Sequence, residues 1–334
     1  MNSATTQVAS VVERVRPVAA GGPVIAAHFL GSTAAFVLGE EAILLVAQDA
    51  SERRVAAHAG AIIAVAADRE KIVSGGDDGT VMATEAKGEC RQLAQDAKRR
   101  WIDQVAAGPA GAVAWAAGKS VFVATRQGEV RSLELPSSAG GLAFAPKGFR
   151  LAIAHYNGAT LWFPNASAKP ESLEWKGSHL GVTFSPDGKF LVTSMQEPML
   201  HGWRLADSKH MRMSGYSAKV RSLTWSADER WLATSGSEQL VLWPFQGKEG
   251  PMGKTPRMLA AHDARVEVVA CHPVQEMVAV GYADGMALLV QLGDSDEVLV
   301  RKPDGNAVSA LAWSARGDVL AYGTEDGAAG LLAL

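Results

Sequence analysis

The sequence repeats one unit of about 40 residues along almost its whole length. Each unit joins two short apolar segments through a turn, such as Ser-Pro-Asp-Gly at residues 185–188 and Ser-Ala-Asp-Glu at residues 226–229. These turn residues supply the preset or positive φ that a tight hairpin needs. Because Gly and turn dipeptides recur about every 8–12 residues, helical periodicity does not fit between them. The pattern therefore predicts an all-β chain built from antiparallel hairpins.

Eight first strands can be counted at this spacing. They open near Val24, Ile62, Ile102, Gly140, Leu180, Val220, Val266 and Val308. Further strands follow each hairpin, and the period is typical of four-stranded propeller blades. We predict a closed β-propeller of eight four-stranded antiparallel blades. Seven blades are the alternative, if the weak unit at residues 107–126 extends its neighbour.

The last blade lacks an outer strand, because the chain ends on a third strand at residues 330–334. An open ring would leave unpaired strand edges that invite aggregation. Residues 10–15, within an N-terminal segment 8–18, are the predicted donor of the missing strand. We therefore expect a single domain, 1–334, with repeats from about residue 22 to residue 334 and with its two termini held together.

The units resemble the WD-repeat family, in a degenerate form, from about residue 8 to residue 334. The family's Gly-His pair corresponds to Ala57-His58 and Ala261-His262, and Gly215-Tyr216 stands in the same place in another unit. The family's closing Trp-Asp pair survives as the Trp alone, at Trp162, Trp203 and Trp243. The resemblance implies a protein-binding propeller that catalyses nothing.

In that family a His, a Ser, an Asp and a Trp hydrogen-bond together within a blade. The resemblance assigns three of these roles to His58, Ser74 and Asp78, while Thr84 stands where the Trp is expected. It therefore implies that His58 is structural and not catalytic.

Composition restricts the partners. The formal net charge is −3 with both signs interspersed, so a continuous basic surface for nucleic acid is not expected. No apolar stretch reaches the length of a membrane span, and residues 1–17 lack the apolar core of a signal peptide. Cys90 and Cys271 are too few for a disulfide framework. We expect a cytoplasmic protein, monomeric by itself, without cofactor.

Catalytic motifs are missing from the sequence. It contains no Gly-x-Ser-x-Gly elbow, His-Glu-x-x-His segment or Gly-x-x-x-x-Gly-Lys-Ser/Thr loop. Residues 195–213 hold soft ligands that could bind copper(I) if they converged. These are Met195, Met199, His201, His210, Met211 and Met213. Since strand geometry separates them, a metal-binding, small-molecule-binding or enzymatic propeller, using this segment or the central channel, is the alternative function.

The candidate binding residues lie where the first strands start, because the WD-repeat resemblance implies that this rim binds partners. The aligned positions before and after each start are Pro23 and Ile25, Ala61 and Ile63, Trp101 and Asp103, Ser178 and Leu180, Lys219 and Arg221, and Arg265 and Glu267. The ends of second strands are expected at the same rim. The predicted protein-binding residues are Arg99, Arg100, Trp101, Asp103, His155, Met195, Lys219, Arg221, Arg265, Glu267 and Tyr282. The basic side chains suit a partner with an acidic surface, and an ordinary solvated collar of loops is the alternative.

Overall fold

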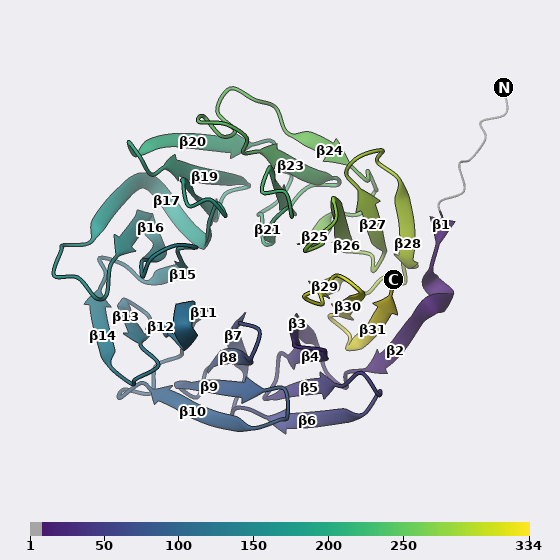
Figure 1. Ribbon diagram of the computed structural model, residues 1–334, viewed down its shortest axis with the longest axis horizontal. Coiled ribbons are helices and arrows are strands. Elements are labelled where there is room, and N and C mark those ends of the chain that lie inside the picture. The colour runs from purple at the N-terminus through teal and green to yellow at the C-terminus, as the bar shows by residue number, and fades with distance from the viewer. Residues whose placement is uncertain (1–8) are drawn as a thin grey trace.

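A computed structural model describes residues 9–334. Its strands form seven hydrogen-bonded sheets that stand in a ring around a central opening (Figure 1). This arrangement is the all-β propeller that the repeat predicts. Within a sheet the chain runs from an inner strand beside the opening to an outer strand (Figure 1).

Three four-stranded sheets follow one another from the N-terminal side. The first contains β3 (Val24–Leu30), β4 (Thr33–Leu38), β5 (Ala42–Val46) and β6 (Glu52–Ala56). The second contains β7 (Ile62–Ala67), β8 (Lys71–Gly76), β9 (Thr80–Glu85) and β10 (Cys90–Gln95). The third contains β11 (Gln104–Ala107), the 3-10 helix η2 (Pro109–Gly111), β12 (Val113–Ala117), β13 (Ser120–Ala124) and β14 (Val130–Glu134).

The remaining sheets complete the ring. The fourth contains β15 (Ala139–Phe144), β16 (Leu151–Trp162), β17 (Glu171–Phe184), β18 (Phe190–Met195), β19 (Met199–Arg204) and β20 (Lys209–Ser214). The fifth contains β21 (Leu223–Trp225), β22 (Trp231–Thr234), β23 (Leu240–Pro244) and β24 (Arg257–Leu259). The sixth contains β25 (Val266–Cys271), β26 (Met277–Tyr282), β27 (Ala287–Gln291) and β28 (Glu297–Arg301). The seventh contains β29 (Val308–Trp313), β30 (Val319–Thr324) and β31 (Ala328–Ala333).

The ring thus has seven sheets and not the eight predicted, because the two units that open near Gly140 and Leu180 share one six-stranded sheet. Hydrogen bonding continues through both long strands. The first part of β16 pairs with β15, its second part pairs with β17, and β17 goes on to pair with β18 from His179. The sequence alternative of seven blades required residues 107–126 to extend a neighbouring unit. These residues instead lie within a separate four-stranded sheet.

Strand β16 turns back on itself near its middle. His155 Nε2 lies 2.9 Å from Thr160 Oγ1, whereas five residues of extended strand would cover roughly 16 Å. Asn157 and Gly158 have φ values of 67° and 141°, a conformation that Asn and Gly adopt most readily. The six-stranded sheet therefore contains the strands of two successive repeat units.

An N-terminal strand closes the ring, as predicted, but through other residues. Strand β2 (Val15–Ala19) pairs antiparallel with β31, from Val15 opposite Leu332 to Ala19 opposite Ala328. The predicted donor, residues 10–15, reaches this pairing only at Val15. Residues before it turn through the 3-10 helix η1 (Val12–Arg14), and β1 (Ala9–Ser10) pairs parallel with β28 of the neighbouring sheet. Residue 8 of the predicted segment lies outside the described residues.

Apolar side chains fill the spaces between neighbouring sheets. Val73, Val113 and Trp115 belong to one such cluster, between the β7–β10 and β11–β14 sheets. Burial of these clusters is the main force that holds the blades together. Neither helix among residues 9–334 is long and apolar enough to cross a membrane.

The buried polar network that the WD-repeat resemblance implies is present in the β7–β10 sheet. His58 Nε2 lies 2.8 Å from Ser74 Oγ, and His58 Nδ1 lies 3.2 Å from Asp78 Oδ1. Burial opposes ionisation of Asp78, but hydrogen bonds from Thr80, Ala59 and His58 outweigh it and lower the pKa of Asp78 to about 2. This network ties the loop before β7 to the β8–β9 turn.

Candidate functional site

The starts of the inner strands share a backbone irregularity. In five strand pairs the pairing register shifts at the second residue of the inner strand, and in the β17–β18 pair it shifts just after His179, where the pairing with β18 begins. The residues that the shifts leave unpaired are Ile25, Ile63, Gly140, Leu180 with Gly181, Glu267 and Ser309. A β-bulge re-aims the side chain of its extra residue. We call the residues flanking these starts, from Pro23 and Ile25 at β3 round to Arg265 and Glu267 at β25, the inner rim.

The inner rim exposes large apolar side chains in neighbouring sheets. Ile25 and Ile63 are 40% and 39% exposed, and Trp101 is 65% exposed. Tyr156, from the fold-back of β16, is 59% exposed. The sequence alignment placed Ile25 and Ile63 at the rim but did not choose them as binding residues. It missed Tyr156, although the turn-forming pair Asn157-Gly158 directly after it indicates an exposed position. Trp and Tyr are the residue types that most often anchor protein interfaces.

Asp96 fixes the loop that carries Trp101. Its buried carboxylate accepts hydrogen bonds from the backbone N–H groups of Lys98 (2.9 Å) and Arg100 (3.0 Å) and from the Arg100 guanidinium (2.7 Å). The Arg100 hydrogen bonds outweigh desolvation and lower the pKa of Asp96 to about 2. Arg100 is thus committed to the loop, while Arg99 and Trp101 remain exposed. The indole is presented on a rigid support.

Asp103 lies at the start of the next inner strand, directly after this loop. Its Oδ1 is buried and receives no hydrogen bond from residues 9–334. Burial raises the pKa of Asp103.

The predicted basic group of the rim carries less net positive charge than its sequence suggests. Arg265 and Glu267 form an ion pair, with 2.9 Å between Nε and Oε1, so their charges offset each other. Lys219 Nζ donates to Gln196 Oε1 at 2.7 Å and forms no ion pair with residues 9–334. Arg221 is exposed. The net positive charge of this part of the rim therefore comes from Lys219 and Arg221.

Three predicted rim residues are buried and do not contribute to the surface. His155, Met195 and Tyr282 are 5%, 2% and 0% exposed. Each ends a second strand opposite a buried residue of the first strand: Ala139, His179 and Val266 respectively. Directly opposed residues of an antiparallel pair lie on the same face of the sheet. Their side chains therefore point between the sheets, where the Tyr282 hydroxyl donates to Ala260 O at 2.6 Å.

The soft side chains of residues 195–213 serve mainly in packing. Met211 and Met213 are buried in a cluster with Phe190 and Tyr216. His201 is fully buried and stacks on Trp175 with ring centroids 4.1 Å apart, and burial lowers the pKa of His201 to about 3. Among residues 9–334, no three His, Cys, Asp or Glu side chains are placed to hold a metal ion.

One segment of the chain matches a protein-family model. Residues 208–243 match the model of the WD domain, G-beta repeat. The match covers β20 and the first three strands of the β21–β24 sheet, and it agrees with the propeller fold and with the His58 network. This segment is a WD repeat, and it lies within a β-propeller. The search of curated proteins found no match to this chain.

Proposed function

We propose that this WD-repeat propeller is a non-catalytic protein-interaction scaffold that binds its partner at the inner rim, around Trp101. WD-repeat propellers generally act as protein-interaction scaffolds. The observation that carries the proposal is an indole that is 65% exposed on a loop fixed by Asp96. Because the loop is already ordered, a partner that covers the indole gains apolar burial with little loss of conformational entropy.

The rim also indicates the chemistry of the partner. Ile25, Ile63 and Trp101 offer apolar contacts in three successive sheets. Lys219 and Arg221 add positive charge elsewhere on the rim. A partner with an apolar side chain for the first region and an acidic surface for the second fits both. We further propose that the protein is monomeric by itself and works in the cytoplasm, where Cys90 and Cys271 remain free thiols.

Pull-down from native lysate tests this proposal with Trp101→Ala and Ile63→Asp. Removing an anchor side chain from an interface commonly costs about 2 kcal/mol or more, which corresponds to about a thirtyfold loss of affinity. We expect both variants to recover at most a few per cent of the partner that the wild type recovers. Their melting temperatures should match the wild type, because both side chains are exposed.

Val274→Asp is the matched control. Val274 is 67% exposed and lies in the β25–β26 turn, at the opposite end of the inner strand from the rim. It should recover the partner as the wild type does. If Trp101→Ala and Ile63→Asp also recover it fully, the partner does not dock on the inner rim.

A further inference from the structure

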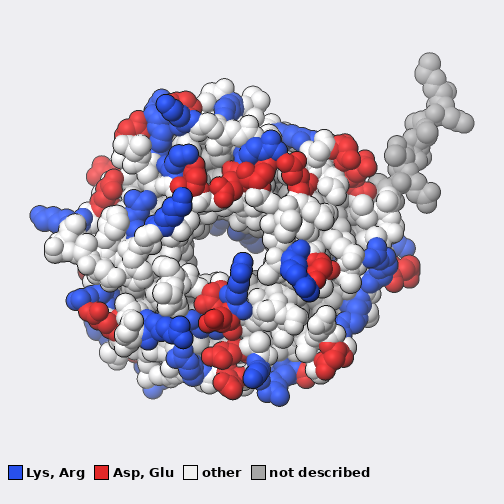
Figure 2. Space-filling view, viewed as in Figure 1, with Lys and Arg blue, Asp and Glu red and all other residues white. Residues whose placement is uncertain are grey.

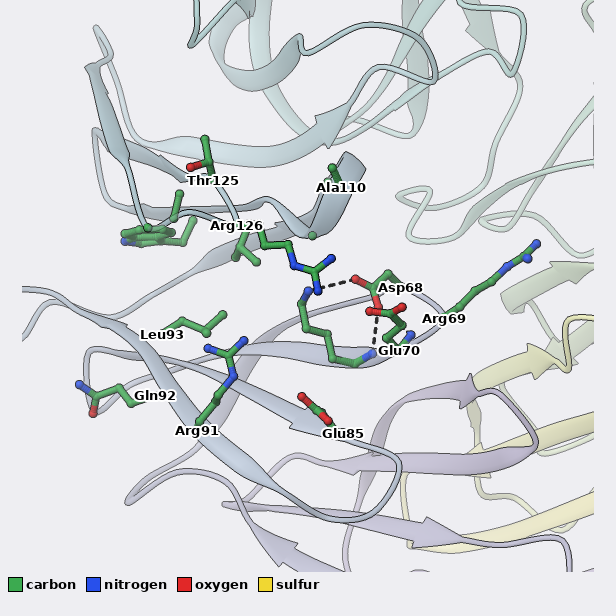
Figure 3. A pocket seen from close by; sticks show the side chains of 17 residues that line it. Asp68, Arg69, Glu70, Glu85, Arg91, Gln92, Leu93, Ala110, Thr125 and Arg126 are labelled. Atoms are coloured by element: carbon green, nitrogen blue, oxygen red, sulfur yellow. Dashed lines mark hydrogen bonds and ion pairs between the residues drawn. The ribbon is translucent and has the colours of Figure 1, made fainter.

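A pocket of about 810 Å³ lies between the β7–β10 and β11–β14 sheets, at the end of the ring opposite the inner rim (Figure 3). The β7–β8 turn and the turn after β13 form its two sides. Figure 3 shows Arg126 entering from one side and Asp68 and Glu70 from another, with Arg91 and Glu85 below them in the view.

The pocket exists because the loop before β12 has almost no side chains. Gly108 and Ala110 line it together with Gly111, where the unit at residues 185–188 carries Ser185 and Asp187 at the first two of these positions. The apolar packing between the two sheets ends at Leu93, Val113 and Trp115, which therefore form an apolar wall. Trp115 is held by stacking on Phe122, with ring centroids 5.4 Å apart.

Two basic side chains of the pocket lining meet beside Gly111. A Cβ on Gly111 would lie 3.7 Å from both Lys71 Nζ and Arg126 Cδ, so these two side chains approach the same point. Lys71 is only 8% exposed, and its Nζ lies 3.2 Å from Asp68 Oδ2. Backbone N–H groups of Glu70 and Lys71 occupy Asp68 Oδ1, at 2.8 and 2.9 Å. Asp68 is thus fully engaged and does not extend a free carboxylate to Arg126.

Two guanidinium groups in the pocket have no protein partner. Neither Arg91 nor Arg126 forms an ion pair or a side-chain hydrogen bond with any of residues 9–334. The hydroxyl of Thr125, which also lines the pocket, is buried without a hydrogen-bond partner among the same residues. Guanidinium and hydroxyl donors beside an apolar wall suit a ligand with oxyanion oxygens and an apolar body.

We propose that this pocket binds an anionic group, a phosphate or a carboxylate, carried on an aromatic or apolar body. Arg91 and Arg126 bind the oxyanion and the wall at Trp115 receives the body. Glu70 and Glu85 line the same pocket, and both carboxylates repel the anion. The proposal does not depend on the inner rim, and the same ligand chemistry could come from a free small molecule or from a side chain of a partner protein.

Isothermal titration calorimetry of the full chain with phenyl phosphate tests the site. We expect a dissociation constant on the order of 1 mM, the range for a ligand of this size, and weaker binding of inorganic phosphate, which lacks the aromatic body. The double variant Arg91→Gln/Arg126→Gln should bind at least about tenfold more weakly. Glu85→Gln should bind about two to five times more tightly, since it removes a repulsive charge.

Arg212→Gln is the matched control, because Arg212 is an exposed arginine on the outer strand β20, far from the pocket. It should bind phenyl phosphate like the wild type. Undetectable binding to the folded wild type would overturn the proposal. So would equal binding by the double variant, an equal loss in Arg212→Gln, or weaker binding by Glu85→Gln.

Two further measurements identify the source of the anion. If native mass spectrometry finds a small anion on the wild type and not on the double variant, the ligand is a free small molecule. If phenyl phosphate displaces a captured protein that the double variant fails to capture, the anion belongs to that partner. In neither case does Trp101→Ala abolish phenyl phosphate binding, which separates this site from the inner rim.

Discussion

Two repeat units use different residue types at the same position of a buried hydrogen-bond network. In one unit, His58 bridges Ser74 and Asp78. In another, Tyr216 takes the corresponding place: Trp243 Nε1 donates to its hydroxyl at 2.7 Å, and the hydroxyl lies 2.8 Å from Thr234 Oγ1. A neutral imidazole and a phenol can each donate one hydrogen bond and accept another, so either can complete such a network.

The His58 network predicts a loss of stability without a loss of binding. His58→Ala leaves Ser74 and Asp78 short of a buried partner, which should lower the free energy of unfolding by about 1–3 kcal/mol. Urea denaturation measures this change. Thr84→Val is the control, because among residues 9–334 the buried Thr84 hydroxyl donates to a single, weak acceptor, Cys90 Sγ at 3.3 Å. If His58→Ala unfolds like the wild type but loses partner affinity, His58 belongs to a functional surface.

Strand β2 closes the ring of sheets. It covers the edge of β31, and Val18 from β2 is buried in the cluster formed with the first sheet. Pro17 is tolerated because β2 is itself an edge strand. Arg14 Nη2 adds a hydrogen bond to Ala333 O at 2.8 Å.

Deleting residues 1–19 should therefore destabilise the protein and promote aggregation, because it exposes the edge of β31. Deleting residues 1–14 keeps β2 and should have the smaller effect. Melting temperature and light scattering of the two truncations separate the contributions of β2 and of the segment before it. Equal behaviour of both truncations would show that β2 does not carry the closure.

The molecule as a whole mixes charges of both signs. Figure 2 shows Lys and Arg interspersed with Asp and Glu around the opening of the face in view, without an extended region of one sign. On this face there is no continuous basic region, and the formal net charge of the chain is −3. A local group such as Lys219 and Arg221 can still steer a partner.

Reversing that local charge should weaken partner capture in a salt-dependent way. Lys219→Glu/Arg221→Glu should leave the melting temperature nearly unchanged, since exposed charges contribute little to stability. Recovery of the partner should fall several-fold at low salt, with a smaller difference at moderate salt because ions screen the interaction. Arg265→Glu alone should matter less, because Arg265 is already offset by Glu267. Equal recovery by the double variant and the wild type would place the acidic contact elsewhere.

The sequence by itself determined the features that depend on local periodicity. Turn residues at a constant spacing determine hairpins, and hairpins at a 40-residue period determine a ring of sheets. The alignment of strand starts also located the inner rim, because the bulges recur at one position of the repeat, at Ile25, Ile63 and Glu267. The resemblance in turn implied the His58 network.

Only the tertiary structure decided which of these side chains are exposed and how the sheets join. His155, Met195 and Tyr282 end their strands at the rim, yet cross-strand pairing directs them inward. Closure by Val15–Ala19 depends on hydrogen bonds to β31, which is far away in the sequence. The continuous hydrogen bonding through β16 and β17 depends on a fold-back that composition does not encode. The pocket at Arg91 and Arg126 arises in the same way, because it forms where two sheets meet and neither sheet alone encloses it.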